Sequence, residues 1–176
     1  LCQFTDPSNR RTLKDFIPLE GIYAAGRLDY RSEGLLVLTD DGLLINQLSD
    51  PQFEHPKTYL VQVEGIATEA MIEMLNQQIL LPGLQTQTAR ASLIGEPVLP
   101  PRPVPVRNYH PTSWLQIVLR EGKKHQVRRM TAAVGLPTLR LVRFSIGDIS
   151  LQGLQPGEWK PLSPAELNGL VMRTKV

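Results

Sequence analysis

The feature that most constrains this chain is a run of polar residues between Gly26 and Gly34 that leads directly into the apolar residues 35–38. A continuous apolar run that follows a glycine-bounded loop predicts a buried strand. Loops held in place by a buried strand are common positions for catalytic side chains. We therefore expect the chain to fold so that this loop is fixed against a core, with a functional site on the loop.

Asp29 is the reactive candidate in this loop because Arg27 and Arg31 flank it. Nearby cations keep a carboxylate ionised and can fix its orientation, and an ionised carboxylate is what a carboxylate nucleophile requires. The same residues also fit a simpler interpretation, in which Asp29 caps a turn and both arginines are solvated. The local sequence leaves both interpretations open.

Two adjacent aspartates, Asp40 and Asp41, follow the apolar run and precede a predicted helix at 43–48. An acidic pair suggests a metal site or an acid–base pair at first sight. Acidic residues at a helix start are, however, stabilised by the helix dipole and by its free backbone N–H groups. We therefore interpret both residues as helix caps and expect no metal site.

Basic residues concentrate in one window, although the net charge of the whole chain is only +2. Between Arg120 and Arg143 there are seven lysines and arginines against one acid, Glu121, so the rest of the chain carries a net charge of −4. This distribution is typical of a polyanion site, although a solvated charged face gives the same pattern. The glycine and two lysines that precede a predicted helix in this window favour phosphate binding.

Hydrophobic periodicity predicts several strands and helices of useful length. The expected strands are 57–63, 89–94, 114–120 and 139–147. Further helices are expected at 69–76, from about 124 and from 164. Residues 97–111 hold six of the 15 prolines, and we interpret them as a stiff surface loop that specifies no chemistry.

With 176 residues, of which 41% are hydrophobic, the chain can build one well-packed domain and not much more. Its one cysteine, Cys2, excludes an internal disulfide framework and a cysteine-rich metal site. No signal peptide or long apolar span is visible in the sequence. We therefore expect a cytoplasmic protein that is not attached to a membrane.

Four segments resemble the signature motifs of the pseudouridine synthases, in the RsuA branch of ribosomal RNA enzymes. The first, at 26–42, has Gly-Arg-Leu-Asp, then Ser-Glu-Gly-Leu-Leu and a closing Thr-x-Asp-Gly. The second is Lys-x-Tyr at 57–59, and the third is Glu-Gly-Lys-x-His-Gln-Val-Arg-Arg-Met at 121–130. The fourth is Leu-x-Arg-x-x-x-Gly at 141–147. All four occur in the order of the family.

The resemblance implies a role for one residue of each motif. Asp29 would be the nucleophile or the base that removes a sugar proton, and Tyr59 would pack against the target base. Arg128 would pair with Asp29, and Leu141 would help to wall the base pocket. A cation beside Asp29 also agrees with the physical argument, because it would keep the carboxylate charged and fix its rotamer.

Further residues of these motifs are expected to contact the RNA substrate or to hold the site together. His125 is expected to hold its loop by hydrogen bonding, and Arg129 is expected at the surface, because the helix turns it about 100° from Arg128. The substrate-binding candidates are Arg27, Leu28, Lys57, Lys123, Lys124, His125, Gln126 and Leu141.

The resemblance implies an α+β fold with a long, bent, mostly antiparallel sheet, flanking helices and a central cleft. It implies one catalytic domain over residues 1–176, without the small N-terminal S4-type RNA-binding domain that many relatives carry. It also implies a monomer that needs neither metal nor organic cofactor and modifies ribosomal RNA, with the large subunit favoured. The alternative is a non-catalytic ribosome-assembly module on the same fold, which would have no need of Asp29.

Overall fold

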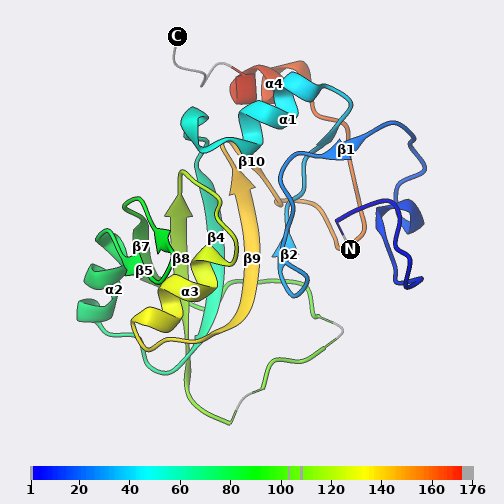
Figure 1. Ribbon diagram of the computed structural model, residues 1–176. Helices are drawn as coiled ribbons and strands as arrows, with labels where there is room; N and C mark the ends of the chain where they lie inside the picture. The colour runs from blue at the N-terminus through cyan, green and yellow to red at the C-terminus, as the bar shows by residue number, and fades with distance from the viewer. Residues whose placement is uncertain (1, 103, 108, 172–176) are drawn as a thin grey trace.

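Figure 1 shows a computed structural model of the chain, which describes residues 2–102, 104–107 and 109–171. A six-stranded sheet forms its centre, with strand order β10-β9-β4-β8-β7 and β2 beside β9. All pairs in this sheet are antiparallel except β2 with β9, which is parallel. The strands are β2 (Glu33–Gly34), β4 (Lys57–Glu64), β7 (Arg90–Ile94), β8 (Thr112–Leu119), β9 (Thr138–Ile146) and β10 (Ile149–Ser150).

Helices and two short ladders surround this sheet. The α-helices are α1 (Gly42–Ser49), α2 (Glu69–Asn76), α3 (Gln126–Ala133) and α4 (Pro164–Val171). The ladders pair β1 (Tyr23–Ala24) with β3 (Leu38–Thr39), and β5 (Leu80–Leu81) with β6 (Leu84–Gln85). Single 3-10 turns are η1 (Leu13–Asp15) and η2 (Pro51–Phe53). In Figure 1, α3 lies across the front of the sheet and α1 with α4 lies beyond one end of it, so the expected α+β fold is confirmed.

The main core lies between the front of the sheet and α3. Val61 of β4 and Leu115 and Ile117 of β8 are completely buried there, as their alternation in sequence predicts. Val127 and Met130, one helical turn apart on α3, pack onto them. Each such buried side chain contributes roughly 1.5–3 kcal/mol to folding, so this layer fixes α3 firmly on the sheet.

Side-chain oxygens cap the starts of two helices, α1 and α2. The Asp41 carboxylate accepts hydrogen bonds from the backbone N–H groups of Leu43 and Leu44, at 2.8 and 3.2 Å. The Thr68 hydroxyl accepts one from Met71 in the same way, at the start of α2. Asp41 therefore serves as the cap of α1, whereas Asp40, which was also expected to be a cap, is exposed at the surface and is not the N-cap.

The prediction of a single strand at 35–38 is wrong. The segment is buried, but the chain passes there from one ladder to another: β2 ends before it on β9, and β3 begins at its end on β1. Leu35 and Val37 are each 5% exposed, so the apolar pattern reports burial correctly. Periodicity cannot reveal that the hydrogen-bonding partner changes, because the partners are distant in sequence.

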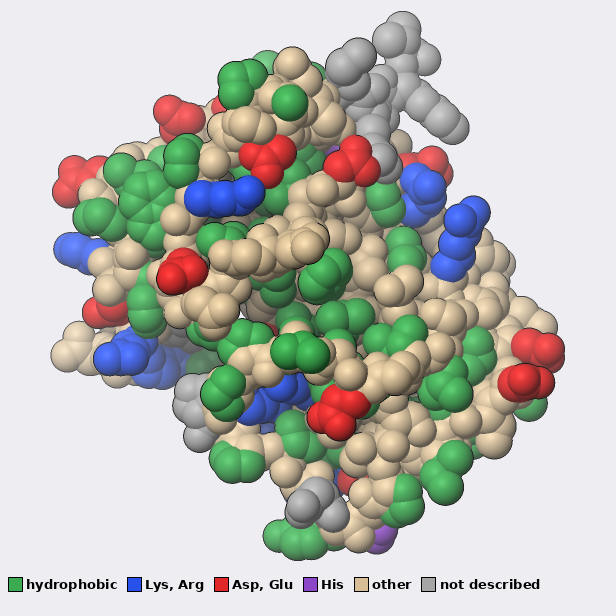
Figure 2. All heavy atoms as spheres, turned by 180° about the vertical axis from the view of Figure 1, so that it is seen from behind, with side chains coloured by type: hydrophobic (Ala, Val, Ile, Leu, Met, Phe, Trp, Pro, Cys, Tyr) green, Lys and Arg blue, Asp and Glu red, His purple; other side chains and the backbone are tan. Residues whose placement is uncertain are grey.

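The rear of the sheet carries a second hydrophobic region. Leu60, Trp114 and Val142 form a small buried cluster on that face. A cavity of about 1160 Å³ lies between the proline-rich loop, the N-terminal segment and the C-terminal tail, with Phe16 and Phe144 among its lining residues. Figure 2 shows hydrophobic side chains gathered across this hollowed face. Among the described residues, no helix is long and apolar enough to cross a membrane.

Candidate active site

The loop that carries Asp29 is fixed to β9 by an unusually close backbone approach. Gly34 has φ +120°, and a Cβ built on it would lie 2.3 Å from the carbonyl oxygen of Arg143. Immediately after it, the Leu35 N–H donates to the same oxygen at 2.7 Å. Only glycine permits this conformation and this contact together, so the end of the loop is pinned to the central sheet.

Asp29 lies at the meeting point of this loop and the start of α3. Its Oδ2 is 3.2 Å from Nδ1 of His125, and the side chains are 29% and 49% exposed respectively. His125 has φ +53° and directly precedes the helix, so α3 begins at Gln126 instead of near 124. The expected loop-holding role of His125 therefore has a definite partner, which is the candidate catalytic carboxylate itself.

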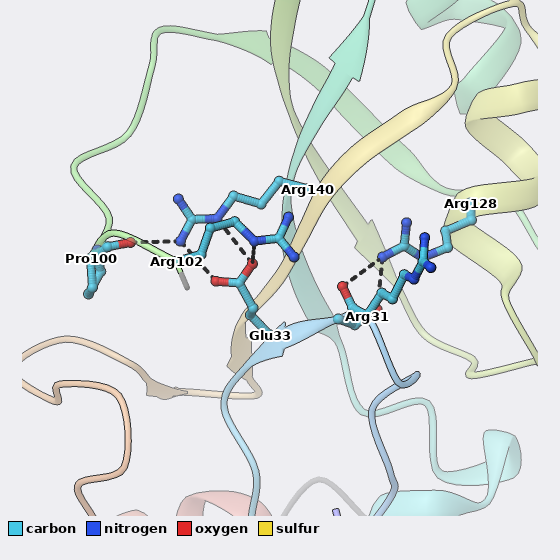
Figure 3. Close-up of polar contacts among 7 residues, drawn as sticks. Arg31, Glu33, Pro100, Arg102, Arg128 and Arg140 are labelled. Atoms are coloured by element: carbon cyan, nitrogen blue, oxygen red, sulfur yellow. Dashed lines mark hydrogen bonds and ion pairs between the residues drawn. The ribbon is translucent and has the colours of Figure 1, made fainter. Parts of the chain in front are cut away.

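Arg128 does not bond directly to Asp29, which differs from the expected ion pair. Its Nη2 donates to the carbonyl oxygen of Arg31 at 3.1 Å and to Oγ of Ser32 at 3.3 Å (Figure 3). Burial lowers the pKa of Arg128, and the negative charge of Asp29 opposes that shift. Arg128 therefore holds the backbone of the Asp29 loop and acts on the carboxylate through space.

Tyr59 approaches the same place from β4, where it pairs in register with Arg143 of β9. Burial raises the pKa of Tyr59, a hydrogen bond and the positive charge of Arg143 lower it, and the charge of Asp29 raises it. The phenol is thus neutral at physiological pH and lies within the electrostatic range of Asp29. Tyr59 and Asp29 are brought together although 30 positions separate them in sequence.

Arg143 is the residue of this site that the motif analysis missed. It is only 3% exposed, and it donates from Nε to the Leu35 carbonyl at 2.9 Å and from Nη2 to the Gly26 carbonyl at 3.2 Å. With its hydrogen bond to Tyr59, it joins both ends of the Asp29 loop to the β4 aromatic ring. The sequence does place Arg143 on the same strand face as the core residue Leu141, and this position could have indicated a buried arginine.

We expect Arg143→Gln to lower turnover about a hundredfold, because a small displacement of a reacting group costs that much. Glutamine is too short to reach both carbonyl groups, so the loop would shift relative to Tyr59. The unpaired carbonyls would each cost about 1–3 kcal/mol, partly offset because a buried charge is removed. Turnover and urea unfolding measure the two effects. Arg90→Gln, on the exposed part of β7, is the matched control, and equal turnover in the two variants would contradict this role.

Lys57 lies buried beneath the site with 6% exposure, which favours structural support over direct contact with RNA. Its Nζ donates to the His55 carbonyl at 3.4 Å. Burial, with a further contribution from the charge of Arg143, lowers the pKa of Lys57 from 10.5 to about 8. The protein therefore holds a charged lysine near neutral pH at a cost in stability.

The Lys57 charge predicts a pH dependence of folding. The unfolded chain keeps this proton up to about pH 10.5, while the folded chain releases it near pH 8. The cost of burying the Lys57 charge is therefore relieved between these values, and the free energy of unfolding rises. Lys57→Met should therefore be more stable than wild type at pH 7. By pH 9.5 the difference should shrink by about 2 kcal/mol. Urea unfolding of both proteins at each pH measures it, and a pH-independent difference would refute the prediction.

The turn before α3 is organised around Glu121, a buried acid with 1% exposure. Its Oε1 accepts from Nε2 of Gln126 at 2.5 Å and from the Gln87 N–H at 2.6 Å, and its Oε2 pairs with Nζ of Lys123 at 3.0 Å. Gln126 is itself 3% exposed. Two predicted substrate-binding residues, Gln126 and Lys123, are thus engaged within the protein and shape the turn.

The other predicted residues are distributed over the surroundings of the site. Arg27 and Lys124 are exposed, so both are available to a ligand. Leu28 is half-buried and lines the rear cavity, and Leu141 is 4% exposed within the main core. Arg129, which was expected at the surface, is half-buried and donates to the Pro82 carbonyl.

The arrangement as a whole is a carboxylate and a phenol held among arginines on a rigid sheet. In the part of the chain that the structure describes, no three His, Cys, Asp or Glu side chains lie close enough together to hold a metal ion.

Comparison with known proteins shows to which family of enzymes this site belongs. Residues 19–133 match the family of RNA pseudouridylate synthases, and the chain belongs to that family. The resemblance drawn from the four motifs is confirmed, and the chain is an enzyme of the isomerase class.

Among curated proteins, the chain is similar to ribosomal large subunit pseudouridine synthase E of Vibrio vulnificus, with 54% identity over 93% of this chain and 70% of that protein. The same enzyme of Xanthomonas campestris is 50% identical over 91% of this chain and 88% of its own length. The solved crystal structure of a pseudouridylate synthase superposes with a TM-score of 0.77 and 30% identity. That match covers 90% of this chain and 65% of the solved chain.

Proposed function

We propose that this chain converts a uridine of large-subunit ribosomal RNA to pseudouridine. The observation that carries the proposal is Asp29, a partly exposed carboxylate on a loop that Gly34 and Arg143 fix to the sheet. An RNA-binding module would not need such a rigidly held carboxylate. The names of the similar proteins from Vibrio and Xanthomonas support the choice of large-subunit RNA as substrate.

The reaction breaks the bond between N1 of uracil and C1′ of its ribose, and forms a bond between C5 of the same base and C1′. C5 loses its proton to solvent and N1 takes up a proton, so the product is an isomer of the starting uridine. Asp29 begins this sequence, either as the nucleophile or as the base that takes a sugar proton. Arg128 and His125 hold Asp29 and its loop in place while the base rotates.

The target nucleotide must leave the RNA stack to reach Asp29. Base flipping costs a few kcal/mol. Stacking of the base on Tyr59 would recover about 1–3 kcal/mol of that cost. Tyr59 is suited to this because its ring is half-buried against the core and its hydroxyl is held by Arg143.

The test is release of tritium from C5 of uracil. The protein is incubated with unmodified large-subunit and small-subunit ribosomal RNA, each labelled at that position, and the released tritium is followed over time. We expect release from the large-subunit RNA only. Release from the small-subunit RNA alone would contradict the substrate assignment, and release from neither would contradict the proposed function.

A further inference from the structure

The proline-rich loop is attached to the Asp29 loop through a cluster of charged side chains. Glu33, at the end of the Asp29 loop, pairs with Nε of Arg102 at 3.2 Å and with Nε and Nη2 of Arg140 at 3.2 and 2.9 Å. Arg140 also donates to the Pro100 carbonyl at 2.8 Å (Figure 3). A loop for which we expected no chemical role therefore places an arginine beside the catalytic loop.

Positive charge exceeds negative charge at this place. One carboxylate, Glu33, serves the two guanidinium groups of Arg102 and Arg140. Figure 3 shows the guanidinium of Arg102 directed toward Arg31 and Arg128. Arg128 donates its hydrogen bonds to neutral oxygen atoms. Burial is the main cause of its lowered pKa, and the charges of Arg102 and Arg31 lower it further, as expected for cations that lie close together.

Such a group of cations is stable only when something offsets the repulsion among them. Asp29 supplies one negative charge nearby. The Arg102 side chain is 20% exposed and Arg31 is at the surface, so both can be reached from solvent. A phosphodiester carries one negative charge, and its oxygen atoms match the planar donor geometry of guanidinium groups.

We propose that Arg31 and Arg102 bind the backbone phosphate next to the flipped uridine in the RNA substrate. This inference rests on the proposed function, because it assumes that RNA enters the site at Asp29. Glu33 and Pro100 act as positioning groups: they hold the proline-rich loop so that Arg102 faces the Asp29 loop. Phosphate contacts of this kind set the register of a nucleic acid without reading its sequence.

The experiment measures RNA binding as a function of salt in the Asp29→Asn background, where the RNA is not converted. The probe is an unmodified transcript of large-subunit ribosomal RNA. Arg102→Gln should weaken binding about tenfold at about 0.1 M salt, because one charge-assisted contact is lost. It should also reduce the slope of log K against log salt by about 0.7–0.9, which is the contribution of one phosphate. Arg102→Lys should restore the slope.

Arg107→Gln is the matched control from the same loop. Arg107 pairs with Glu64 at 3.0 Å, at the far end of β4 from Tyr59, and should leave affinity and slope unchanged. Thermal unfolding is used to verify that the Arg102→Gln and Arg107→Gln proteins are both folded. Equal RNA affinity and equal salt slope in the two folded proteins would overturn the proposal. The tritium assay with the protein that retains Asp29 separates the two ideas: a slope loss in Arg102→Gln, together with no tritium release by the wild-type protein, would preserve the phosphate site and reject the proposed function.

Discussion

Asp29→Asn is expected to reduce tritium release by at least about a thousandfold, because the amide can act neither as nucleophile nor as base. Asparagine has the same size, and its side-chain oxygen can still contact Nδ1 of His125, so the fold should be unchanged. RNA affinity should be equal or slightly higher, because a negative charge is removed from a site that binds a polyanion. Single-turnover tritium release and a filter-binding titration measure the two quantities.

The control for this substitution is Asp40→Asn. Asp40 belongs to the same motif but is exposed, and the neighbouring Asp41 makes the cap bonds of α1. The variant should therefore release tritium at the wild-type rate. Near-native release by Asp29→Asn would show that another group performs the chemistry. A loss of turnover in both variants would point to the charge of the segment instead of to Asp29.

Gly34→Ala is expected to destabilise the protein by at least about 3 kcal/mol. The new Cβ would lie 2.3 and 2.5 Å from the carbonyl oxygen and the nitrogen of Arg143, which are backbone atoms of the central strand β9. The φ of +120° is also unfavourable for alanine. Relief of the contact requires β2 to separate from β9, so the Asp29 loop should move and turnover should fall as well. Urea unfolding and tritium release measure both effects.

Gly42→Ala provides the matched control within the same motif. Nothing lies within 4 Å of a Cβ at this position, and the residue begins α1 without a positive φ. The free energy of unfolding of the Gly42→Ala protein should equal that of the wild type or exceed it by up to about 1 kcal/mol. An unfolding midpoint of Gly34→Ala that equals that of Gly42→Ala would contradict the close approach as a constraint on the fold.

Local patterns predicted most elements of the sheet and helices. The strand patterns at 57–63, 114–120 and 139–147 correspond to β4, β8 and β9, and the helix at 69–76 corresponds to α2. These elements are long and regular, so their side-chain periodicity reports which face is buried. The short segments β2 and β3 could not be predicted, because each is defined by a partner elsewhere in the chain.

In the site, too, the sequence predicted positions along the chain but not the partners that are distant in sequence. The motifs predicted the position of Asp29 on a fixed loop, and the structure places it beside the segments that carry Tyr59 and Arg128. They did not predict that His125 is the direct partner of Asp29, nor that Gln126 is buried against Glu121. Side-chain partners depend on which rotamers the packed structure allows, and sequence spacing does not determine these.

The sequence by itself determined the chemistry of this protein: a carboxylate, a phenol and a basic segment in the order of a known family, on elements whose periodicity predicts an α+β core. The tertiary structure alone decided how these groups are held. Arg143 joins Gly26, Leu35 and Tyr59, and Arg102 reaches Glu33 from the proline-rich loop. The physical reason is that these contacts join residues 69–117 positions apart, and only the folded sheet brings such partners within hydrogen-bonding distance.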